Sequence, residues 1–207
     1  MNYDSLIMLN NCIKSELPLD IIEIINENVI INKVRGTQNG TIDYACKTNN
    51  FKLLKLYKKY NLPYTEQSLI YACYHGNLNM VIYIDNNFVF DKNKTCFAEI
   101  ASKKGHFNII KWLHYNNYKF SILTLFNSEI NHYIDVLNYI CKNIKNIDCN
   151  IIDLKIAVNV GNFKIIDYIF NKIFDENIDF IKYSLTYGYT KSIIMINDLI
   201  NYYETIN

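Results

Sequence analysis

Apolar residues recur along this chain at the spacing of an α-helix, in short runs separated by turns. The clearest run is Met80, Val81 and Ile84, whose side chains fall on one helical face. Strict alternation of apolar and polar residues, the pattern of a half-buried β-strand, does not persist along the sequence. The pattern therefore predicts an all-α protein.

The helical runs belong to an internal repeat. In its clearest copies, at 71–84, 100–113 and 156–169, a small residue is followed four positions later by glycine and then by an apolar run. Weaker copies surround Ala45 and the serines at 128 and 184. The six turn positions, where the glycine or its substitute stands, are 49, 76, 105, 132, 161 and 188, at spacings of 27, 29, 27, 29 and 27 residues. Such a sustained register predicts a repeat architecture.

Each copy predicts two antiparallel helices joined at the turn position. Small residues stand where the first helices of neighbouring copies press together, because a larger side chain would overpack there. Glycine ends the first helix because it adopts the left-handed conformation without steric cost; Asn49 tolerates it next best and His132 fits it least well. Neighbouring pairs must bury one another's apolar faces, so we expect a helical solenoid of about six short repeats over residues 37–207.

At the small, glycine and following apolar positions the chain resembles the ankyrin repeat, most clearly at 69–84, 98–113 and 154–169. It departs from that family in two ways. Gln67, Ser68, Leu69 and Ile70 stand where the Thr-Pro-Leu-His start belongs, and the period is shorter than the usual length of about 33 residues. The resemblance implies an ankyrin-type solenoid that mediates protein–protein interaction without catalysis. Short repeats rich in Asn and Tyr are similar to ankyrin proteins of giant viruses such as mimivirus, which would make the partner a host protein.

Residues 1–36 lie outside the repeat and are expected to form an N-terminal helical cap on the open end of the solenoid. Pro18 suits a first helical turn, and isoleucines follow at helical spacing. A second interpretation is that residues 17–25 resemble the opening of an F-box, the module that docks substrate receptors onto a cullin-type ubiquitin ligase. The chain would then be a substrate-recruiting adaptor. The match is short and no tryptophan follows it, so the cap is favoured.

Composition limits the classes of partner. The formal net charge is only +1, so no overall positive field would hold the chain on nucleic acid or on an acidic membrane surface. Apolar stretches fall far short of the roughly 20 residues that a membrane span needs, and no secretory signal is recognisable. The six cysteines form no Cys-x-x-Cys pair and are expected to be buried in a reducing compartment. We therefore expect a monomer in the cytoplasm, or in the host cytoplasm if the A/T-rich codon bias reflects a virus rather than a protist.

Motifs of catalysis were not found in the sequence. It contains no Walker-type phosphate loop, His-Glu-x-x-His pair, nucleophile elbow or zinc-spaced Cys and His cluster. The segment at 36–41 resembles a phosphate-binding loop but has no lysine. Three of the four histidines stand at the turns between helices, where polar side chains satisfy free helix ends. We therefore expect no enzyme activity, cofactor or metal.

Candidate partner-binding residues follow from the repeat. In a solenoid, first-helix faces line a continuous surface that is large enough for a macromolecule. The side chains two positions after the small residue lie on the first helix and are not needed for the apolar stack. These candidates are Lys47, Tyr74, Lys103, Glu129, Asn159 and Thr186, with Tyr74 the expected main contact.

Overall fold

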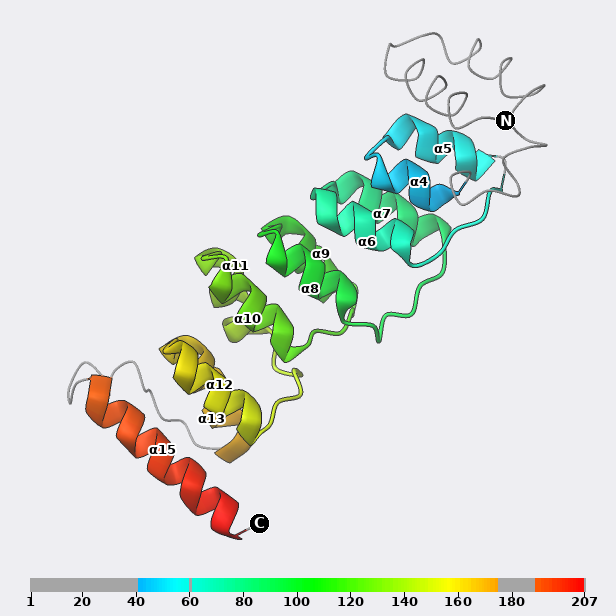
Figure 1. Ribbon diagram of the computed structural model, residues 1–207. Helices are drawn as coiled ribbons and strands as arrows, with labels where there is room; N and C mark the ends of the chain where they lie inside the picture. The colour runs from blue at the N-terminus through cyan, green and yellow to red at the C-terminus, as the bar shows by residue number, and fades with distance from the viewer. Residues whose placement is uncertain (1–40, 60, 175–188, 207) are drawn as a thin grey trace. The chain divides into compact units, whose positions relative to one another are not determined.

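The computed structural model describes residues 41–59, 61–174 and 189–206. All regular elements in these ranges are α-helices, which confirms the all-α prediction (Figure 1). None of them is both long and apolar enough to cross a bilayer. The predicted N-terminal cap, the F-box-like segment at 17–25 and the last predicted turn, around 184–188, lie outside the described residues.

The helices follow one another as pairs, in which a first helix is joined to a second helix by a short turn. The pairs are α4 Ile42–Lys47 with α5 Phe51–Lys59, α6 Gln67–His75 with α7 Leu78–Asn87, α8 Cys96–Lys103 with α9 Phe107–Tyr115, α10 Ile122–Ile130 with α11 Ile134–Asn143, and α12 Ile151–Val160 with α13 Phe163–Phe174. The longer helix α15, Tyr189–Ile206, completes the described chain.

The chain divides into two compact units at residues 91 and 92, and each unit is described by itself. In unit 1, the first helices α4 and α6 pack against each other and against their own second helices, α5 and α7. In unit 2, α8 packs against α10, α9 against α11, α11 against α13, and α12 against α15. Consecutive helix pairs therefore share a core within each unit.

All five described turn positions are left-handed, as their spacing predicts. The φ angles are 51° at Asn49, 74° at Gly76, 71° at Gly105, 59° at His132 and 78° at Gly161. At each of the first four turns, the next backbone N–H donates to the carbonyl of the small residue in the preceding helix. These bonds are Asn50 N to Ala45 O, Asn77 N to Ala72 O, His106 N to Ala101 O and Tyr133 N to Ser128 O. This closure satisfies carbonyls that the helix end would otherwise leave unpaired.

The small residues of the repeat lie at the centre of the packing. Ala45, Ala72, Ala101, Ser128 and Ala157 are all fully buried. Ser128 is the polar member of the set, and its hydroxyl donates to the carbonyls of Thr124 and Leu125 in its own helix. Its burial therefore leaves no unpaired hydroxyl, which would otherwise be costly.

Contacts between neighbouring first helices recur at every second helix pair. The Thr65 hydroxyl donates to Asp43 Oδ2 over 2.6 Å, and the Ser121 hydroxyl donates to Glu99 Oε1 over the same distance. Glu99 and Ser121 each stand 56 residues after their counterparts, which is the sum of the spacings 27 and 29. The same carboxyl–hydroxyl bond thus ties α4 to the start of α6 in unit 1, and α8 to the start of α10 in unit 2.

The second helices repeat in the same way. Phe51 meets Tyr83 edge-on at 5.3 Å between ring centroids, and Phe107 meets Tyr139 edge-on at 5.5 Å. A lysine four residues after each phenylalanine places its ammonium over that ring: Lys55 over Phe51 and Lys111 over Phe107. The structural period over these four pairs is therefore two helix pairs, or 56 residues.

The doubled period explains why the spacings alternate. After α5 and α9 the chain turns through a left-handed asparagine, with φ of 51° at Asn61 and 61° at Asn117. After α7 and α11 it leaves through extended residues instead, with φ of −138° at Phe88 and −106° at Ile144. The tight exit needs fewer connecting residues, so the turn spacing is 27 after the first kind and 29 after the second.

Candidate interaction surface

The predicted partner-binding residues lie at or near the C-terminal ends of first helices. Lys47 and Tyr74 in unit 1, and Lys103 and Asn159 in unit 2, are exposed to solvent, whereas Glu129 is half-buried. Thr186 lies outside the described residues. Lys47 and Tyr74 stand on the packed helices α4 and α6, and Lys103 and Glu129 stand on the packed helices α8 and α10.

Tyr74 is the aromatic member of this set. Its side chain is 45% exposed, and its ring meets the ring of His75 edge-on at 5.3 Å. His75 Nε2 lies 2.9 Å from the carbonyl oxygen of Lys47, the last residue of α4. A hydrogen bond between first helices therefore positions the histidine beside which Tyr74 stands, and an aromatic ring remains available to a partner.

Helix α12 has an exposed apolar face. Ile152, Ile156 and Val160 follow one another at intervals of four residues, so they lie along one side of the helix, and they are 63%, 44% and 47% exposed. The opposite side, formed by Leu154, Ala157 and Val158, is buried. Core formation does not use these three side chains, which lie on the same helix as the predicted residue Asn159. Contiguous exposed apolar surface of this kind marks interaction sites.

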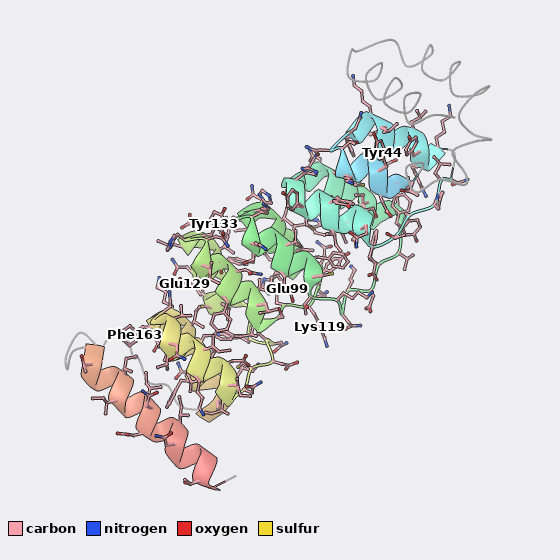
Figure 2. All side chains as sticks on the ribbon, viewed as in Figure 1. Tyr44, Glu99, Lys119, Glu129, Tyr133 and Phe163 are labelled. Carbon is pink, nitrogen blue, oxygen red and sulfur yellow. The ribbon has the colours of Figure 1, made fainter. Side chains whose placement is uncertain are left out.

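A second exposed apolar group surrounds the turn between α10 and α11. Ile130 is 67% exposed, Ile134 is 62% exposed, and Tyr133 between them is 36% exposed. Figure 2 shows Glu129 and Tyr133 together at the end of this pair where the two helices are joined. The predicted Glu129 thus lies beside apolar side chains that the sequence interpretation did not include.

The described histidines make contacts within the fold. Besides the bond of His75 to Lys47, His114 Nδ1 lies 2.9 Å from the Tyr139 hydroxyl, which joins α9 to α11. His106 and His132 belong to the turns that follow α8 and α10. No group of three or more His, Cys, Asp or Glu side chains placed to hold a metal ion occurs in the described part of the chain.

No model of a protein family matches the sequence, and neither the curated proteins nor the solved structures gave a match. The function is therefore inferred from the residues of the two units themselves.

Proposed function

We propose that the chain is an ankyrin-type helical-repeat protein that binds another protein and catalyses no reaction. The left-handed turns support this proposal, because each follows a buried small residue by four positions, as the ankyrin resemblance implies. The packing of consecutive helix pairs within each unit also supports it. A repeat protein gains stability from neighbouring repeats and leaves side chains on its helix faces free for recognition.

The observation that carries the binding proposal is the exposed face of the first helices. On α12 it holds Ile152, Ile156 and Val160, which are apolar and in solvent. On α6 it holds Tyr74, which is 45% exposed. Apolar and aromatic side chains supply most of the binding free energy of protein interfaces, because they lose water contact with little loss of rotamer freedom. The exposed lysines Lys47 and Lys103 would orient an acidic partner at the margin of this surface.

The proposed partner is a single protein, and a host protein in the cytoplasm if the chain is viral. Neither nucleic acid nor a membrane surface is part of the proposal, because the formal net charge is only +1. The chain would bind this partner as a monomer.

Affinity purification with matched variants tests this function. Tagged wild-type chain, the variant Tyr74→Ala/Lys103→Ala and the control Lys52→Ala/Asn108→Ala would be used to capture proteins from lysate of the source or host cell. Lys52 and Asn108 are exposed on the second helices α5 and α9, so the control changes one residue in each unit away from the first helices. We expect one protein to be retained by the wild type and the control and depleted with the first variant. Equal capture by all three chains would contradict the proposal.

A further inference from the structure

The second helices α11 and α13 of unit 2 enclose an open cavity of about 580 Å³. This lies within the usual range for small-molecule sites, roughly 300 to 1,000 Å³. It is separate from the proposed protein-binding surface, which is formed by first helices. The residues lining it are Asn138, Cys141, Lys142, Lys145, Lys164, Asp167, Tyr168, Asn171 and Lys172.

The charge of this lining is strongly positive. Four lysines and a single acid, Asp167, give it a formal charge of +3, although the whole chain carries only +1. Ammonium groups gathered around one cavity repel one another, and that repulsion is relieved when an anion binds among them.

Two of the four lysines are held in place by hydrogen bonds between the helix pairs. Lys164 Nζ donates to Asn138 Oδ1, and Lys172 Nζ donates to the carbonyl oxygen of Lys145 over 2.8 Å. The Tyr168 hydroxyl donates to the carbonyl oxygen of Ile144 over 2.9 Å and fixes the wall between them. Positioned charges bind a ligand with a smaller loss of conformational entropy.

Helix dipoles explain only part of this arrangement. Lys142 stands in the last turn of α11 and Lys172 in the last turn of α13, where positive charge is favourable. Lys164, in contrast, is the second residue of α13, where the dipole disfavours a cation. Lys145 lies beyond the end of α11 with its side chain exposed. These two lysines add to the positive charge of the cavity without benefit to their helices.

We propose that this cavity binds a small ligand that carries two or more phosphate groups. The ammonium of lysine is a compact charge that suits phosphate oxygens. Lys164 and Lys172 provide the positioned charges, and the exposed Lys142 and Lys145 close on the ligand from the α11 side. Asp167 excludes part of the wall from the anion and favours a ligand that contacts the lysines at both ends of the cavity.

Titration of the full chain with sodium tripolyphosphate tests this site. Isothermal calorimetry at low ionic strength would compare the wild type, Lys142→Gln/Lys145→Gln and the control Lys103→Gln/Lys104→Gln. Both variants remove two exposed positive charges from unit 2, but the control pair lies on and beside the first helix α8. We expect saturable one-to-one binding that is weakened about tenfold or more in the first variant and less than about twofold in the control.

A second measurement locates the bound probe. In amide NMR spectra of the wild-type chain, tripolyphosphate should shift signals of residues 138–145 and 164–172 and leave those of α4 to α7 in place. Absence of saturable binding, equal weakening in the two variants, or shifts spread over both units would overturn the proposal. Because the protein-binding proposal concerns first helices, its failure would leave these results unchanged.

Discussion

The ring of Tyr133 lies over Gly105, so close that a methyl group on Gly105 would stand 2.6 Å from Cδ1 and Cε1 of the tyrosine. Gly105 ends the turn after α8, and Tyr133 holds the corresponding place at the start of α11. The φ angle of Gly105 is 71°, in the region that favours glycine. Two independent constraints, one of the backbone and one of packing, therefore select glycine at this position.

Substitution of Gly105 should separate these two constraints. We expect Gly105→Ala to lower the free energy of unfolding by about 2–3 kcal/mol, because the new methyl group meets the ring in a strained backbone. In a Tyr133→Ala background the same substitution should cost only about 1 kcal/mol, which is the backbone part. Urea denaturation of the four chains measures this double-mutant cycle.

The control for this cycle is Lys103→Ala, an exposed change two residues earlier, which should alter the free energy of unfolding by less than about 0.5 kcal/mol. Additive effects of Gly105→Ala and Tyr133→Ala would show that the ring does not constrain the glycine.

His132 should be replaceable by glycine with a gain in stability. Its φ of 59° is unfavourable for a side chain with a Cβ, and relief of that strain exceeds the entropy that glycine adds to the unfolded chain. We expect His132→Gly to raise the free energy of unfolding by about 0.5–1 kcal/mol. His106→Gly, at a φ of −79°, is the matched control and should lower it. A loss of stability in both variants would contradict the strain assigned to His132.

Buried thiols should make the protein less stable at high pH. Burial, with a smaller effect of the Asp43 carboxylate, raises the pKa of Cys46 well above its usual value, and burial raises the pKa of Cys141 to about 12. The unfolded chain releases these protons near pH 9, whereas the folded chain retains them, so stability falls as the pH rises above about 9.

Comparison of the wild type with Cys46→Ala measures one of these thiols. Between about pH 8 and 10.5, Cys46 should account for about 2 kcal/mol of the wild-type loss in unfolding free energy. The variant should therefore lose about that much less over the same interval. Equal losses in both chains would mean that the Cys46 thiol ionises as readily in the folded state as in the unfolded state.

The turns of this fold could be predicted from the sequence, because the spacing of a small residue and a turn residue reports directly on local geometry. Even His132, the poorest candidate, is left-handed, since the bond from Tyr133 N to Ser128 O closes the turn through the backbone. The doubled period could not be predicted in this way. Its carboxyl–hydroxyl pairs join residues of different helices, and Asp43 and Thr65 are replaced by the chemically similar Glu99 and Ser121.

The surfaces were harder to predict than the turns. Apolar residues lie all round α12, so the pattern does not indicate that Leu154 is buried while Ile152 and Ile156 are exposed. Packing of the neighbouring helices decides which face is covered. The lysines of the cavity were missed for a similar reason, since Lys142 and Lys172 come together only when α11 packs against α13.

Binding through the first-helix face is tested most directly by the dissociation constant of the captured partner. Calorimetry with purified partner would compare the wild type, Tyr74→Ala/Lys103→Ala and Lys52→Ala/Asn108→Ala, with the melting temperature of each chain measured alongside. We expect the first variant to bind about tenfold or more weakly at an unchanged melting temperature, and the control to bind as the wild type does. Unchanged affinity in the first variant together with weaker binding by the control would place the partner on the second helices and contradict the proposed function.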